Sequence, residues 1–249
     1  MKNRSLIIIG AVILVSLILL ELFPNYILPY QEYRPNLISD IDLVEFNAAD
    51  YYKDGIKIGT YKAIFEGKDQ SSGFNTYTIS TKTEIIYKEK PMTVDSRLII
   101  NDRMRIVGYS VNASINNISS VTTVTMHGSN ANVTNIVMED SVTLDVNIPD
   151  NAIVIDNTQP IHWELLFKSF KFELGKRYRV LVFVPQVAMV QSWEISVDQN
   201  PQTVTINGKS YSCIVIRQSE LDIQVYFSNN EMIRYRDQKN GIVIDKRVN

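Results

Sequence analysis

The sequence is poor in the residues that build metal centres, disulfides and cysteine or histidine active sites. Its 249 residues contain one cysteine, Cys213, and two histidines, His127 and His162. A structural zinc site needs about four Cys or His ligands, and an internal disulfide needs two cysteines, so both are excluded. The two histidines have no H-x-H or H-E-x-x-H spacing. We therefore expect neither a metal ion nor a cofactor.

The chain also lacks a strong excess of charge of either sign. Lys and Arg number 25 and Asp and Glu 27, which gives a net charge of −2. Phosphate binding depends on clustered Lys and Arg, so the balance argues against a nucleic-acid partner. No G-x-S-x-G, G-x-x-x-x-G-K or G-x-G-x-x-G motif occurs. The usual sequence arguments for a hydrolase or a nucleotide-binding loop are therefore missing.

One long hydrophobic run stands out near the start. Leu6 to Leu20 is apolar apart from Gly10 and Ser16, and Lys2 and Arg4 precede it. A helix from Ser5 to Phe23 would be about 28 Å long, which matches a bilayer core of roughly 30 Å. The sequence predicts a transmembrane signal-anchor helix with a cytoplasmic tip at residues 1–23. The basic start places the N-terminus inside and the rest of the chain outside the cytoplasmic membrane.

A cleaved signal peptide is the alternative for this segment. It would require small residues in an A-x-A arrangement after the run, and the chain reads LLELFPNYILPYQEY there. Residues 24–43 contain Pro24, Pro29 and Pro35 interleaved with tyrosines, which favours an extended juxtamembrane linker. Residues 44–249 are then the extracytoplasmic domain.

Alternation of apolar and polar residues dominates this domain. Between Ser141 and Ile148, Val142, Leu144 and Val146 alternate with polar residues. Such a period of two is typical of half-buried antiparallel strands. Turn signals separate the runs, for example Asp54-Gly55, Asn207-Gly208 and Asn240-Gly241. The pattern predicts a mainly β domain of about 10–13 antiparallel strands.

One segment has helical spacing instead. It reads IHWELLFKSFKFELGK, and Trp163, Leu166, Phe167 and Phe170 recur in it at intervals of three and four. Pro160 is suited to the first turn of a helix, and Gly175 lies beyond the expected end. We expect one short helix here that covers the apolar face of the sheet.

Three sequence stretches resemble envelope domains of the LolA lipoprotein-carrier type. They are YYKDGIKIGTYKAIF, VTINGKSYSCIVI and VYFSNNEMIRYRDQKNGIVI, which flank the polar-faced strands and the short helix. The resemblance implies a strongly curved antiparallel sheet, or half-barrel, around a short helical plug. A β-sandwich is the alternative fold. The family's carriers diffuse freely, whereas this chain retains a predicted anchor, and no functional residue is transferred from the family.

These observations lead to a non-catalytic binding or scaffold module as the first functional hypothesis. If the sheet is curved, its concave apolar face is suited to a lipid acyl chain or a hydrophobic segment. Trp163, Leu166, Phe167 and Phe170 would then gate the ligand. Tyr51, Tyr52 and Tyr61 are the first candidates for stacking on a glycan. An accessory subunit of a membrane complex is a further alternative.

An anchored cysteine transpeptidase or hydrolase similar to a sortase is the hypothesis from another class. Its candidate catalytic residues are Cys213 with Arg217 or Arg234, and His127 or His162. Cys213 lies in the alternating strand KSYSCIVIR, between aromatic and β-branched residues. This setting favours a cysteine that packs in the core over a nucleophile.

Sequons for N-glycosylation outside the predicted anchor occur at Asn112, Asn117 and Asn132. They lie in a region rich in Asn, Ser and Thr, which is also typical of a solvated strand face. Their use depends on an organism that glycosylates exported asparagines. The expected partners are therefore the membrane itself and a lipid, an envelope protein or a glycan.

Overall fold

The computed structural model describes residues 30–32, 48–70, 75–116, 118–156 and 158–248. The chain divides into two compact units, Met1–Gln31 and Glu32–Asn249, and the fold described below is that of the second unit. The predicted anchor at 1–23 and most of the predicted linker lie outside the described residues. None of the helices described is long and apolar enough to cross a membrane.

The first half of the second unit is a run of long strands joined by short turns. After β1 (Gln31–Glu32), the strands are β2 (Ala49–Lys53), β3 (Ile56–Asp69), β4 (Thr76–Tyr87), β5 (Lys90–Asn101), β6 (Ile106–Ile115), β7 (Ile118–His127), β8 (Asn130–Val137) and β9 (Asp140–Asn147).

The second half begins with a short strand and the helix. Its elements are β10 (Ile153–Val154), α3 (Pro160–Lys168), β11 (Arg177–Val184), the 3₁₀ turn η2 (Pro185–Val187), β12 (Met189–Val197), β13 (Gln202–Ile206), β14 (Lys209–Gln218), β15 (Ile223–Ser228), β16 (Glu231–Asp237) and β17 (Ile242–Lys246). The predicted helix is confirmed, with Pro160 in its first turn.

The strands follow one another in a single sheet order. From β10 the order runs through β17, then to β2, and then along the chain to β9. The pairing of β17 with β2, for example Ile244 with Tyr51, joins the two halves. The β-sandwich alternative is therefore wrong. The expected 10–13 strands were also too few, since the described residues form seventeen, because several apolar runs are divided by turns without Gly or Asn.

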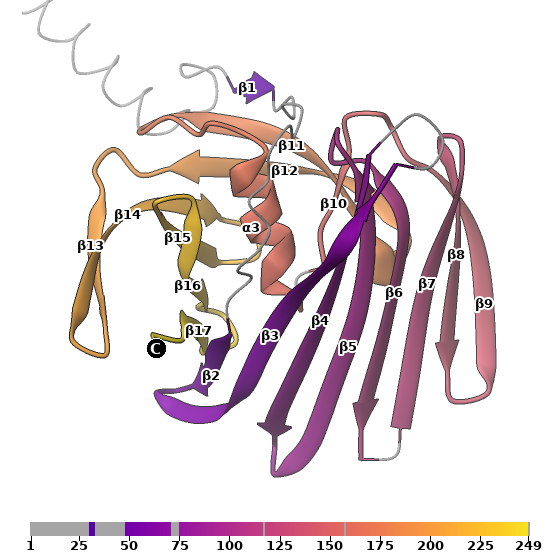
Figure 1. The fold of residues 1–249 in the computed structure, drawn as a ribbon, viewed down its shortest axis with the longest axis horizontal. Coiled ribbons are helices and arrows are strands. Elements are labelled where there is room, and N and C mark those ends of the chain that lie inside the picture. Colours follow the sequence, from indigo (N-terminus) through magenta and orange to yellow (C-terminus); the bar gives the residue numbers. More distant parts are fainter. Residues whose placement is uncertain (1–29, 33–47, 71–74, 117, 157, 249) are drawn as a thin grey trace, which may run out of the picture. The chain divides into compact units, whose positions relative to one another are not determined.

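The sheet curves around α3, as the resemblance implied (Figure 1). Trp163 stacks on Trp193 of β12, with ring centroids 5.8 Å apart. Phe167 stacks on Phe227 of β15 at 3.9 Å. At the start of the helix, His162 meets Tyr109 of β6 edge-on at 5.6 Å. The helix thus contacts strands from both halves of the sheet.

One pairing departs from the antiparallel expectation. β10 pairs in parallel with β11, with Ile153 opposite Val182 and Val154 opposite Phe183. Parallel neighbours require a crossover connection, and α3 lies within it. The sequence did not predict this pairing because β10 has only two residues and no detectable alternation.

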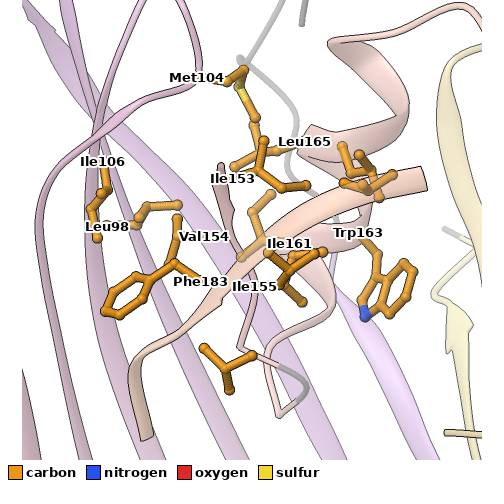
Figure 2. Close-up of a cluster of buried hydrophobic side chains, with 14 of the residues drawn as sticks. Leu98, Met104, Ile106, Ile153, Val154, Ile155, Ile161, Trp163, Leu165 and Phe183 are labelled. Carbon is orange, nitrogen blue, oxygen red and sulfur yellow. The ribbon is translucent and has the colours of Figure 1, made fainter. Parts of the chain in front are cut away.

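The main core lies between α3 and the inner face of the sheet. Figure 2 shows side chains from β5, β6, β11 and α3 gathered with those of the Ile153–Ile155 segment. Ile155, Phe183 and Leu98 are all buried there. A second, smaller core of Val204, Ile206, Cys213, Val215, Tyr226 and Ile233 packs where the β13–β14 hairpin meets β15 and β16.

Alternation and burial agree along most strands. In β4 the inner residues Tyr77, Ile79, Thr81 and Thr83 are buried, and the residues between them are more exposed. β9 is the exception. It was expected to be half buried, but seven of its eight residues are exposed. The reason is its place at the end of the sheet order, where it pairs only with β8 among the described strands.

Candidate functional site

A groove of about 770 Å³ crosses the face of β3–β7 that points away from α3. We call it the outer groove. Most of its lining residues are polar or charged, and they come mainly from neighbouring strands at matching positions. They include Thr60, Lys62, Ser80, Lys82, Glu84, Asp95, Arg97, Ser110, Asn112 and Arg247. The surface they expose to the groove is mostly aliphatic, and Ile64, Val111 and Val121 add to it.

Strand register aligns the groove residues in rows. Lys62 pairs with Lys82, and Lys82 in turn pairs with Asp95. Asp95 pairs with Asn112 of β6. Because directly paired residues project from the same face of a sheet, these four side chains form one row across four strands. The long polar-faced strands of the sequence thus produce a polar surface that a linear pattern alone does not locate.

Lys62 and Lys82 place two like charges directly opposite each other. Lys82 forms an ion pair with Glu84 at 2.6 Å, and both groups are largely exposed. Hydrogen bonding to Glu84 raises the pKa of Lys82. No ion pair is found for Lys62 among the described residues. Directly opposed like charges disfavour strand pairing. Glu84 and Asp95, which lies opposite Lys82 on β5, offset the charge of Lys82, whereas the charge of Lys62 has no such partner among the described residues.

Two ion-pair clusters border the row. Arg97 contacts Glu66 at 3.2 Å, and Ser80 donates a hydrogen bond to the same carboxylate. The hydrogen bond from Ser80, and then that from Arg97, lowers the pKa of Glu66. At the other border Asp50 accepts from Arg247 at 2.6 Å and lies 3.0 Å from Lys57 Nζ.

Desolvation raises the pKa of Asp50, but hydrogen bonds from Arg247 and Lys57 outweigh it and hold that pKa below its usual value. The carboxylates of both border clusters therefore remain ionised and keep the guanidinium groups in place. The groove consequently presents fixed cations and hydroxyl groups to solvent, together with the carboxylates of Glu84 and Asp95.

A buried polar network anchors the start of α3 on the opposite face. Tyr109 Oη donates to Asp156 Oδ2. Asp156 Oδ1 accepts from the Thr158 amide at 2.8 Å and from its hydroxyl at 2.6 Å. Thr81 donates to Gln159 Oε1 at 2.6 Å and lies 2.6 Å from Ser96. These bonds connect β4, β5 and β6 to the helix, and they suit a structural role.

His162 belongs to the same network. Its Nδ1 lies 3.0 Å from the carbonyl oxygen of Val154, so Nδ1 carries the proton and donates. The other ring nitrogen is buried and has no hydrogen-bond partner among the described residues. Desolvation lowers the pKa of His162, opposed by the charge of Asp156. The ring is therefore neutral at neutral pH and has no access to solvent.

The residues considered for a cysteine active site lie in different parts of the fold and do not form one site. Cys213 is fully buried in the smaller core. Burial raises the pKa of its thiol to about 11, which suppresses the reactive thiolate. Arg217 is bound to Asp198 through two bonds of 2.6 and 2.8 Å. His127 is exposed at the end of β7, in the other half of the sheet order.

Arg234, the second arginine candidate, is likewise held in an ion pair, here with Asp245. It makes two hydrogen bonds to Asp245, of 2.6 and 2.8 Å. These bonds raise its pKa further. In the described part of the chain, no group of three His, Cys, Asp or Glu side chains is arranged to hold a metal ion.

The predicted gate residues form part of the packed interior. Trp163 and Leu166 are buried, and Phe167 and Phe170 are partly buried. Phe170 meets Tyr178 edge-on at 5.2 Å. Their role as a gate stays a prediction. Two of the tyrosines considered for glycan stacking, Tyr51 and Tyr61, are also buried beneath α3, so that expectation was wrong for both.

The sequons have different settings. Asn112 is exposed in the outer groove. Asn132 is half buried on β8 and donates to Asp145 at 2.7 Å. Asn117 lies outside the described residues. Glycosylation of the three stays a prediction.

No protein-family model matches this chain, and no curated protein matches its sequence. Structural comparison finds three distant similarities. A DUF1089 family protein from Pseudomonas aeruginosa is 10% identical over 71% of this chain and 89% of its own, with a TM-score of 0.41. A β-barrel-like protein of the DUF1849 family from Brucella abortus is 11% identical over 84% of this chain and 100% of its own, with a TM-score of 0.42.

The third is a protein with a YmcC-like fold from Bacteroides fragilis, for which export has been suggested. It is 10% identical over 88% of this chain and 96% of its own, with a TM-score of 0.21. Identities and TM-scores at this level support no transfer of function.

Proposed function

We propose that this chain is a non-catalytic binding module that acts outside the cytoplasmic membrane, held there by the predicted anchor at 1–23. Its ligand is an elongated anion rich in hydroxyl groups, such as an acidic glycan, and it lies in the outer groove. Lys62 carries the proposal, because it lies directly opposite Lys82 and no ion pair is found for it among the described residues, so a bound anion would supply its counter-charge.

The remaining groove residues support this ligand class. Arg97 and Arg247 are held by carboxylates at the borders and can share donors with a ligand. Ser80, Ser110 and Asn112 supply hydroxyl and amide groups between them. The groove extends across five strands, which suits a chain-like ligand better than a small compact ion. The buried thiol of Cys213 favours binding over cysteine catalysis.

The test is calorimetric titration of the full chain, in detergent, with a short oligogalacturonate and with a neutral maltooligosaccharide. We expect binding of the acidic oligosaccharide that weakens as salt is added. Lys62→Gln and Lys82→Gln should each weaken it by about tenfold, because each removes a charged hydrogen-bond donor.

Lys239→Gln is the matched control, since Lys239 is exposed in the turn between β16 and β17, away from the groove lining. It should bind like the wild type. Equal affinity for the neutral oligosaccharide, or full affinity in both groove variants, would overturn the proposal.

A further inference from the structure

The free edge of the sheet at β9 has the properties of a peptide-docking site. β9 is the last strand in the sheet order and, among the described strands, pairs only with β8. This edge is separate from the outer groove, whose lining comes mainly from β3–β7. The inference is therefore independent of the proposed function.

The backbone of β9 offers hydrogen-bonding groups to a further strand. The Ile148 amide donates to the Ser129 carbonyl at 2.8 Å, directly beyond the β8–β9 ladder. Because backbone groups alternate in direction along an antiparallel strand, even-numbered residues of β9 face β8. The N–H and C=O groups of Ser141, Thr143 and Asp145 consequently point to the free edge.

β9 has few of the features that protect an edge strand against pairing, and those few are the charges of Asp140 and Asp145. Natural edge strands are usually blunted by Lys, Pro, a bulge or a covering segment. β9 reads DSVTLDVN and contains neither Lys nor Pro. Its register with β8 continues without a shift from Asp140 to Asn147. Over eight residues it is long enough for a stable extra strand.

The face of β9 that continues the core surface is apolar and uncovered. Val142 is 57% exposed and Leu144 46%, and Val137 at the adjoining end of β8 is 51% exposed. The amide of Asn135, which pairs with Val142, reaches the Gln186 carbonyl at 3.5 Å. Val187, which follows Gln186 in the sequence, is also exposed. Apolar side chains therefore flank the edge where a partner strand would lie.

The charge of this region specifies the partner further. No Lys or Arg occurs between Ile106 and Phe167. Glu139, Asp140 and Asp145 lie on β9 or in the turn before it. A second copy of β9 would bring the same acidic residues to the edge and be repelled. A basic strand would be attracted.

We propose that β9 binds an extended segment of another protein in which apolar residues alternate with Lys or Arg. The segment adds one strand to the sheet through the outward backbone groups of Ser141, Thr143 and Asp145. Its apolar side chains cover Val142 and Leu144. Its basic side chains pair with Asp145 and the acidic turn.

The probe is a capped peptide of alternating valine and lysine, titrated against the full chain by fluorescence anisotropy. The control peptides replace lysine by glutamate, or carry N-methyl groups on alternate backbone amides. We expect the lysine peptide to bind, with affinity that falls as salt rises, and both controls to bind at least about tenfold more weakly.

Thr143→Pro is the decisive variant. It removes an N–H that faces the free edge and leaves the backbone bonds to β8 intact, since proline is tolerated in edge strands. Like Thr143→Val, it also loses the 3.0 Å hydrogen bond between the Thr143 and Thr134 hydroxyls. Thr143→Val is its matched control, because it keeps the N–H. Peptide affinity should fall about tenfold in Thr143→Pro and stay unchanged in Thr143→Val. Urea unfolding of both variants verifies that each is folded.

Several results would overturn the proposal. One is equal binding of the lysine and glutamate peptides, and another is full binding by folded Thr143→Pro. If sedimentation experiments show a dimer of the wild type and a monomer of Thr143→Pro, the edge binds a second copy of this chain. Binding to phosphatidylcholine vesicles that is lost in Leu144→Ser would assign the apolar face to lipid.

Discussion

The hydroxyl of Tyr109 on β6 donates a hydrogen bond to the carboxylate of Asp156, and both side chains are buried. This bond ties the centre of the long-stranded half of the sheet to the segment that leads into α3. The charge of a buried carboxylate is tolerated only when donors surround it, and Tyr109 and Thr158 supply them here.

Tyr109→Phe should therefore destabilise the protein without removing much apolar contact. We expect a loss of about 1–3 kcal/mol, the usual range when a buried charged acceptor loses a donor. Urea unfolding followed by tryptophan fluorescence measures it. Tyr87→Phe, at the end of β4, is the control and should cost less than about 0.5 kcal/mol. An equal, small effect of both changes would show that the Tyr109 bond does not matter.

Stability should fall as the pH drops below the ordinary pKa of histidine. His162 has a lowered pKa in the folded protein, mainly through desolvation. The unfolded chain then binds more protons than the folded one from about pH 6.5 downward, so protonation favours unfolding. Asp156 and Tyr109 face the ring, and Glu164, with its pKa raised by desolvation, acts in the opposite sense.

His162→Asn separates the histidine from the carboxylates. Asparagine can keep a donor towards the Val154 carbonyl but does not titrate. The measurement is the free energy of unfolding at pH 7.5 and pH 5.5 in both proteins. The wild type should lose more stability over this interval than the variant. A loss of the same size in both would assign the pH dependence to other groups.

Gly59 is required by close strand packing. A Cβ at this position would overlap the backbone carbonyl of Glu84 and lie 2.6 Å from the Ile85 Cα. Gly59→Ala should therefore cost roughly 1–3 kcal/mol. Gly67→Ala on the same strand is the control, because a Cβ there meets nothing within 4 Å.

Gly67→Ala should be neutral or should stabilise the protein by about 0.5 kcal/mol, since glycine weakens a strand. Thermal melting by circular dichroism compares the two variants. Similar melting temperatures for both would contradict the close approach at Gly59.

Cys213 should resist alkylation until the protein unfolds. Its thiol is fully buried and its pKa is raised to about 11. Mass spectrometry after treatment with iodoacetamide, with and without urea, counts the added groups. We expect modification only in urea. Rapid modification of the native protein would restore the cysteine enzyme as a hypothesis.

Local signals in the sequence predicted much of the fold. Asp54-Gly55 and Asn207-Gly208 have the positive φ angles that two-residue hairpins require, as their composition indicated. The turn at Lys88-Glu89 has positive φ at both residues as well, but carries no Gly or Asn. The sequence did not predict that turn, because the pairing of β4 with β5 imposes positive φ angles on residues that rarely adopt them.

The candidate sites were less predictable because they depend on register between distant strands. Lys62 and Lys82 are separated by 20 positions in sequence, and only the β3–β4 pairing places them opposite each other. The burial of Tyr51 and Tyr61 likewise depends on where α3 packs. The absence of Lys and Arg between Ile106 and Phe167 was readable from the sequence alone and would have indicated the acidic edge at β9.

The pairing of β17 with β2 determines the order in which the parts of the sheet form during folding. Every other antiparallel pair among the long strands joins elements that are near in sequence, so each half can assemble by successive hairpins. Joining Ile244 to Tyr51 closes a loop of almost the whole domain, which carries the largest entropic cost. We expect two growing hairpin arrays that exist separately at first, and a final step in which this single seam makes them one sheet.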